Sequence, residues 1–301
     1  MASNRRPVLA SVSADTGLPD DATLASAIDA NRSQPGLLVL THLYGKLADY
    51  PGARAMADQR GWVLLENDSL AATAGSPREC APRTTRLLSF GSGKTVDGGG
   101  GGAILTNDAR LADTLSTRAS AWPVFDHAAD QTEDHIVLAR RHLSAIGLAW
   151  ASEPLFAVEV AQCRHSFDPN LAEPILAALH RFPESNARRL ARLAMWNEVL
   201  ADVSHAISAP PVPISAAWRG LFRVQNEELR DRIVIAMREA GHDAGTNYPP
   251  LWDVAPTLVG DQRDTRGDAW GQTVVTLWLT DTYDQNRIRS AADVIKRTIG
   301  G

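Results

Sequence analysis

One short segment of the sequence places a lysine where chemistry is conceivable. Residues 90–95 read FGSGKT, and five consecutive glycines follow at 98–102. A phosphate-binding loop of the Walker A type needs a glycine at position 88 and a helix directly after the lysine. Position 88 is Leu88, and a glycine run does not nucleate a helix. The segment therefore argues against a nucleotide site and leaves Lys94 as a candidate for amine chemistry, with an ordinary surface lysine as the alternative.

Polar residues stand at the ends of three apolar runs. His42 follows the run at 36–41, Glu66-Asn67-Asp68 closes the run that begins at 61, and Ser89 precedes Lys94 by five residues. Side chains alternate between the faces of a strand, so Asn67 and Asp68 point opposite ways unless the strand ends at Glu66. A plain polar strand end, or a packing histidine in the case of His42, remains the alternative for each.

The elements around these residues alternate in type. The apolar runs predict strands, and the runs at 36–41 and 61–66 suit strands buried on both faces. Strands alternating with helices predict an α/β, doubly wound, mostly parallel sheet. The expected strands are 6–12, 36–41, 61–66, 85–90 and 102–106, and the expected helices are 22–30, 51–60 and 108–119.

The second half of the chain has a different character. A long amphipathic helix is expected over 186–203, and a strand, helix, strand and helix follow between 220 and 299. The sequence thus predicts a large domain over 1–150, a helical bridge over 151–205 and a small α+β domain over 206–301.

Composition narrows the function classes. A net charge of −5 gives no electrostatic reason to expect nucleic acid or an anionic membrane as a partner. Cys80 and Cys163 form no cluster with metal-ligand spacing, which argues against structural zinc and suits a reducing compartment. No apolar run approaches the roughly 18 residues of a membrane span, and the first residues lack a signal-peptide pattern. We therefore expect a cytoplasmic protein.

The lysine segment resembles a known family motif. Ser89-Phe90, Lys94, the glycine cluster and the strand ending Thr106-Asn107-Asp108 are similar to the central motif of the DegT/DnrJ/EryC1/StrS (sugar) aminotransferases, which are fold type I pyridoxal 5'-phosphate (PLP) enzymes. Further segments resemble the family in the same order: 41–45 (THLYG), 62–71 (WVLLENDSLA), 168–178 (DPNLAEPILAA), 245–249 (GTNYP) and 274–295.

The resemblance implies a cofactor and roles for residues. Lys94 would form a Schiff base with PLP and move the proton during transamination, and Ser89 would bind the cofactor phosphate. Asn67 stands at the position of the acid that faces the pyridine nitrogen, with Asp68 beside it. The implied substrate is a small molecule, a keto sugar or related natural-product intermediate. His42, Asn247 and Tyr248 would lie on the substrate side.

The sequence also departs from the family pattern. It begins at a point inside the family's large domain, so we expect the N-terminal part, with its phosphate-anchoring turn, to be missing. Asp168 and Asn170 stand where an Asn and an Arg normally serve the neighbouring subunit's phosphate, and an acid there repels it. We therefore expect weak PLP affinity and a homo- or hetero-oligomer, possibly with a full-length homologue. A degenerate, non-catalytic partner that stabilises or regulates an intact aminotransferase is the alternative function.

Overall fold

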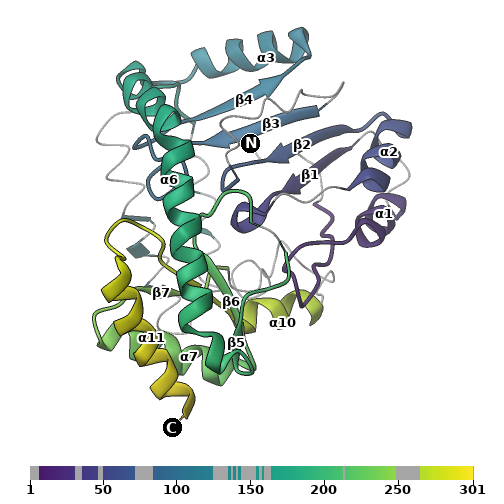
Figure 1. Ribbon diagram of the computed structural model, residues 1–301. Helices are drawn as coiled ribbons and strands as arrows, with labels where there is room; N and C mark the ends of the chain where they lie inside the picture. Colours follow the sequence, from purple (N-terminus) through teal and green to yellow (C-terminus); the bar gives the residue numbers. More distant parts are fainter. Residues whose placement is uncertain are drawn as a thin grey trace.

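The computed structural model describes residues 7–30, 36–46, 50–71, 84–124, 164–212, 214–248 and 265–300, with a few positions between 135 and 158. These residues form two four-stranded sheets, and a long helix runs past both (Figure 1). Of the helices described, none is both long and apolar enough to cross a membrane. Cys80 and Cys163 lie outside the described residues.

The first sheet contains four of the strands predicted from the sequence. They lie in the order β1 (Leu37–Thr41), β2 (Val63–Asn67), β3 (Thr84–Ser89) and β4 (Gly102–Thr106). The first three are parallel, and β4 runs antiparallel to β3. The strand expected at 6–12 is wrong over its described part, because residues 7–12 pair with no strand. Val12 instead packs against a buried cluster that contains Trp270.

Two helices cover one face of this sheet. α1 (Asp21–Asp29) begins after Asp20, whose carboxylate accepts a hydrogen bond from the Thr23 N–H at 2.6 Å. α2 (Pro51–Gln59) begins with a proline, whose fixed φ suits the first helical position. Both helices contribute to one core with the inward side chains of the strands, made of Leu24, Ile28, Leu38, Leu40, Tyr50, Ala53, Ala57 and Leu64.

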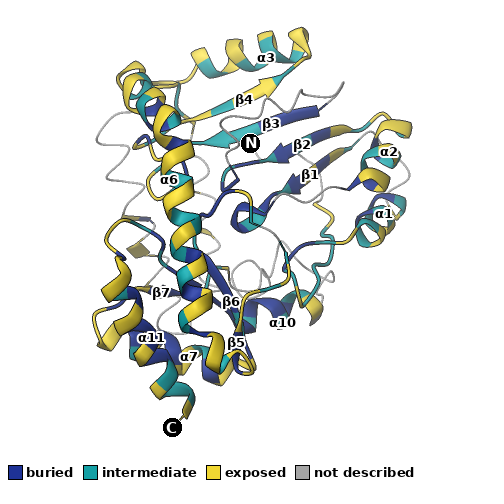
Figure 2. Ribbon diagram, viewed as in Figure 1, coloured by how far each residue is buried: buried dark blue, intermediate teal, exposed yellow. Residues whose placement is uncertain are grey.

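Burial varies from residue to residue along β1 and β2 (Figure 2), and exposed apolar side chains lie on the opposite face of the same sheet. The strand register places Leu37, Val39, Val63 and Ile104 on this side, where they are 39–53% exposed. We call these four side chains the open sheet face. The expectation that β1 and β2 are buried on both faces is therefore wrong, because α1 and α2 cover one side only and no described element covers the other.

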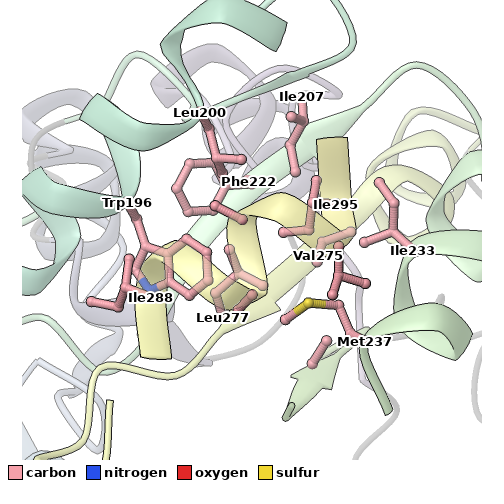
Figure 3. Packing of buried hydrophobic residues seen from close by; sticks show 14 of the residues in the cluster. Trp196, Leu200, Ile207, Phe222, Ile233, Met237, Val275, Leu277, Ile288 and Ile295 are labelled. Carbon is pink, nitrogen blue, oxygen red and sulfur yellow. The ribbon is translucent and has the colours of Figure 1, made fainter. Parts of the chain in front are cut away.

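The second sheet closes the chain. Its order is β5 (Ile207–Ser208), β6 (Gly220–Val224), β8 (Val274–Leu277) and β7 (Ala244–Gly245), with antiparallel pairing throughout. Side chains from α7 (Glu227–Glu239) and α11 (Gln285–Gly300) pack with it into the largest core (Figure 3). α10 (Thr265–Thr273) immediately precedes β8.

The long helix α6 (Ala172–Val199) connects the two halves. Ile175 and Phe182 in its first half pack against residues of the loop between β3 and β4. Leu193 and Trp196 in its second half belong to the core of the second sheet. α3 (Ala109–Ser120) has no buried residue and lies on the surface beside β4. The limits of the three expected domains stay predictions.

Candidate active site

Lys94 lies in the loop that joins β3 to β4, and the residues directly after it, up to β4, form no helix. The loop is held by its own backbone: the Phe90 carbonyl accepts hydrogen bonds from the N–H groups of Gly98 (2.9 Å) and Gly100 (3.1 Å). The Asp97 carboxylate accepts from the N–H of Gly93 at 2.8 Å and of Gly99 at 3.0 Å. The absence of a helix at this point agrees with the rejection of a Walker A site.

The glycine run allows α6 to approach the loop. A Cβ on Gly98 would lie 2.4 Å from Cγ1 of Ile175, closer than real contacts permit. Gly101 has φ +81°, a conformation that side chains other than glycine rarely adopt. The run therefore serves packing of α6 onto the Lys94 loop, and a purely flexible spacer does not account for it.

The Lys94 side chain is half-buried, and burial lowers the pKa of its amine. The next residue, Thr95, is buried, and its hydroxyl has no hydrogen-bond partner within the described part of the chain. A buried donor of this kind costs free energy unless a ligand or water satisfies it. The loop thus presents a partly desolvated amine next to an unused hydroxyl.

The strand register separates Asn67 from Asp68. Thr41 pairs with Asn67, Asn67 pairs with Leu87, and Ser89 lies two residues beyond Leu87. Because alternate residues share a face, Thr41, Asn67 and Ser89 all lie on the side of the open sheet face, at the carboxyl ends of their strands. The Asn67 amide nitrogen is 3.5 Å from the Thr41 hydroxyl. The Asn67 amide oxygen accepts a hydrogen bond from the Ser69 N–H at 3.2 Å.

Asp68 lies on the opposite side in a buried charge network. Its side chain is 1% exposed and accepts from Nε of Arg86 at 2.7 Å, with a second contact from the same guanidinium. His42 is fully buried, with Nε2 3.3 Å from Oδ1 of Asp68 and 3.9 Å from Oε1 of Glu66. The His42 side chain therefore reaches this network and not the surface.

Glu66 completes the network by pairing with Arg54. Burial alone would raise its pKa, but the nearby His42 ring and the paired Arg54 guanidinium hold the pKa at about 2. Two acids and two arginines thus neutralise each other under α2. This network accounts for Asp68 and Glu66 as structural ions on the helix-covered side of the sheet.

Asn247 and Tyr248 lie in an aromatic cluster beside the Lys94 loop. Tyr248 stacks on Trp218 with ring centroids 6.2 Å apart and planes 5° apart, and it is 41% exposed. The Tyr248 N–H donates to the Tyr44 hydroxyl at 3.2 Å, and Asn247 accepts from Arg219 at 3.1 Å. Trp218 in turn donates from its indole nitrogen to the Gly93 carbonyl at 2.8 Å. The structure therefore links Tyr248 to Lys94 through Trp218.

Reasoning from sequence missed Trp218 and Tyr44. Tyr44 is 1% exposed and has φ 60°, an unusual conformation for a residue other than glycine. Tyr44 lies in the segment 41–45, which resembles the family, and Trp218 lies two residues before β6. No spacing in the sequence pairs Trp218 with Gly93, which lies 125 positions earlier. Only the tertiary fold reveals this contact.

Comparisons with known proteins agree with the fold and the motif. The profile of the DegT/DnrJ/EryC1/StrS aminotransferase family matches residues 1–288. A curated relative, the L-glutamine:2-deoxy-scyllo-inosose aminotransferase of Streptomyces paromomycinus, is 33% identical over 212 residues. That match covers 66% of this chain and 43% of the relative, so this chain matches less than half of the relative's length.

Solved structures show the same fold. The aminotransferase TlmJ from Streptoalloteichus hindustanus superposes with a TM-score of 0.72 at 18% identity, over 98% of this chain and 73% of that one. The aminotransferase from Psychrobacter cryohalolentis gives a TM-score of 0.69 at 18% identity, over 98% and 75%. The fold is thus the α/β fold of the fold type I PLP-dependent transferases. With its profile match over nearly the whole length, the chain belongs to the DegT/DnrJ/EryC1/StrS aminotransferase family, whose members are PLP-dependent.

Proposed function

We propose that this chain is a PLP-dependent aminotransferase in which Lys94 holds the cofactor through a Schiff base. An amino group would pass from an amino acid to a keto sugar or a related natural-product intermediate. The half-buried Lys94 amine, in a loop fixed by Asp97 and α6 directly after Ser89, is the observation that carries the proposal. The substrate class is supported by the relative whose name specifies 2-deoxy-scyllo-inosose.

The described residues fit the attachment of PLP. Burial lowers the pKa of Lys94, which increases the fraction of neutral amine that can react with an aldehyde. Ser89 on the open side of the sheet and the unused Thr95 hydroxyl are donors suited to a phosphate. When bound, PLP supplies the electron sink for the reaction. The Lys94 amine would be the group of this chain that carries the proton during amino transfer.

The site fits the pyridine nitrogen less well. Asn67 lies on the same side as Ser89, whereas Asp68 is turned away and paired with Arg86. A neutral amide does not stabilise a protonated ring nitrogen by charge, as a carboxylate would. We therefore propose that Asn67 faces the ring and that the chain binds PLP weakly on its own.

An amino-transfer assay of two lysine variants, one of Lys94 and one control, tests the proposal. The assay follows PLP-dependent conversion of a polyhydroxylated cyclic ketone to its amine with glutamine or glutamate as donor. Lys94→Ala should abolish conversion, and Lys296→Ala, which removes a partly exposed lysine paired with Asp202, should leave it unchanged. Equal conversion by wild type and Lys94→Ala would rule out a role for Lys94.

A second candidate is a non-catalytic partner subunit for an intact aminotransferase homologue. The engagement of Asp68 by Arg86, the neutral Asn67 and the open sheet face favour it. A longer homologue could cover the open sheet face and complete the site. In a reconstituted complex of the two chains, Lys94→Ala in this chain would leave turnover unchanged under this role, and it would reduce turnover if this chain is itself catalytic.

A further inference from the structure

Trp218 reaches the Lys94 loop from the C-terminal half of the chain. Its indole N–H donates to the Gly93 carbonyl at 2.8 Å, and the side chain is 8% exposed. Trp218 lies two residues before β6, so the bond joins the segment that leads into the second sheet to the loop of the first. The bond is part-buried and spans the two halves of the molecule.

The contact acts on the peptide unit that leads into Lys94. The Gly93 carbonyl and the Lys94 nitrogen belong to one planar peptide group, so fixing the carbonyl direction also fixes the bond from which Lys94 begins. The preceding peptide group is held by Asp97, whose carboxylate accepts from the Gly93 N–H at 2.8 Å. Hydrogen bonds thus hold the peptide groups on both sides of Gly93, which has φ +76° and no side chain that could anchor it.

The indole itself is held in place by its neighbours. Tyr248 stacks on one face in nearly parallel orientation, and the Arg219 guanidinium lies 4.4 Å from the ring centroid. Tyr44 stacks at 6.5 Å and is anchored by the Trp270 indole, which donates to its hydroxyl at 3.2 Å. Trp218 therefore has little freedom to turn its N–H away from Gly93.

We propose that Trp218 is a positioning residue for Lys94: its hydrogen bond to Gly93 sets the direction in which the lysine leaves the backbone. This inference rests on the proposed function, in which Lys94 carries the cofactor. It predicts that loss of the indole N–H loosens the loop and weakens cofactor capture while the fold stays intact.

Hydrogen exchange tests the positioning without any cofactor. Trp218→Phe keeps an aromatic ring but loses the N–H donor. We expect amide exchange in residues 91–96 to rise about fivefold, the equivalent of one ordinary hydrogen bond. Exchange in β1 and β2 should not change. If Trp218→Phe folds poorly, replacement of the indole by its benzothienyl isostere, which lacks only the N–H, serves as the second variant.

Trp196→Phe is the matched control, because the Trp196 indole donates to the Trp278 carbonyl at 3.2 Å in the other core. It should leave exchange in 91–96 unchanged. If amide exchange in residues 91–96 were as slow in Trp218→Phe, or in the isostere, as in the wild type, the inference would be overturned. Titration with PLP separates the two proposals: wild type without a Lys94-dependent adduct contradicts the proposed function, whereas equal PLP affinity of wild type and Trp218→Phe contradicts the positioning role alone.

Discussion

Asn67 and Asp68 are neighbours with opposite surroundings. Asn67 lies with Ser89 on the open side of the sheet, and Asp68 is buried against Arg86. We expect Asn67→Asp to tighten PLP binding about fivefold, because a charged partner makes a stronger hydrogen bond than a neutral one. The measurement is PLP titration followed by absorbance.

Asp68→Asn is the matched change. It should leave the buried Arg86 with the longer contact to Glu66, at 3.9 Å, and lower the free energy of unfolding by about 3 kcal/mol, as measured in urea. If Asp68→Asn weakened PLP binding at unchanged stability, while Asn67→Asp had no effect, Asp68 and not Asn67 would face the cofactor.

Lys46 is a buried cation without a carboxylate partner among the described residues. Its side chain is fully buried, and Nζ donates to the Thr16 carbonyl at 2.6 Å and lies 5.1 Å from the Trp270 ring centroid. Desolvation lowers the pKa of Lys46 to about 8. The unfolded chain therefore binds the proton more tightly, and the charged lysine costs about 3 kcal/mol of stability at pH 7.

We expect Lys46→Met to be more stable than wild type at pH 7 by about 1–2 kcal/mol, once the lost hydrogen bond is included. The cost of the charged lysine disappears as pH rises from about 8 towards 10.5. The free energy of unfolding of the wild type relative to that of the variant should therefore be about 2 kcal/mol higher at pH 9.5 than at pH 7. Urea unfolding at the two pH values measures this. A difference that does not change with pH would show that Lys46 has an ordinary pKa.

The turn after β1 is a tight junction between the two halves of the chain. The Gly45 carbonyl accepts from the N–H groups of Ser215 and Ala216 at 3.1 and 3.2 Å, and Gly45 has φ +80°. A Cβ there would lie 1.5 Å from the Ala216 carbonyl oxygen. The two halves of the chain meet at this point without room for a side chain.

We expect Gly45→Ala to cost about 4 kcal/mol or more, because backbone must move in addition to the unfavourable φ. Gly241→Ala is the control: Gly241 has φ +77° but nothing within 4 Å of an added Cβ, so it should cost about 1 kcal/mol. Thermal unfolding compares them. Equal losses would mean that the close approach to Ala216 is unimportant.

The local sequence pattern predicted most helices and strands, but it did not predict what packs against them. Apolar runs and the spacing of apolar residues predicted β1 to β4, α1 and α2 within a few residues. They could not show that β4 is antiparallel or that β1 has an exposed face, because both depend on which element lies alongside. Likewise, alternation correctly separated Asn67 from Asp68, but the Arg86 partner and the Trp218 contact arise only from tertiary packing.

The first sheet carries exposed apolar side chains on the face that α1 and α2 do not cover. Leu37, Val39, Val63 and Ile104 gather on one side, and exposed apolar patches on sheets favour association. We expect light scattering to show an oligomer, alone or with a homologous chain. Val39→Lys with Ile104→Lys should shift it towards monomer, and Ile235→Lys, at an exposed apolar position on α7, should not. A wild-type monomer that also binds no homologue would contradict this account.

Chemical trapping measures most directly whether Lys94 carries PLP. The protein, with its partner if one is required, is incubated with PLP, reduced with borohydride, digested and mapped by mass spectrometry. We predict a phosphopyridoxyl group on the peptide that contains Lys94 and none on those containing Lys46 or Lys296, with the label absent from Lys94→Ala. Labelling spread over the lysines, or unchanged in Lys94→Ala, would contradict the account.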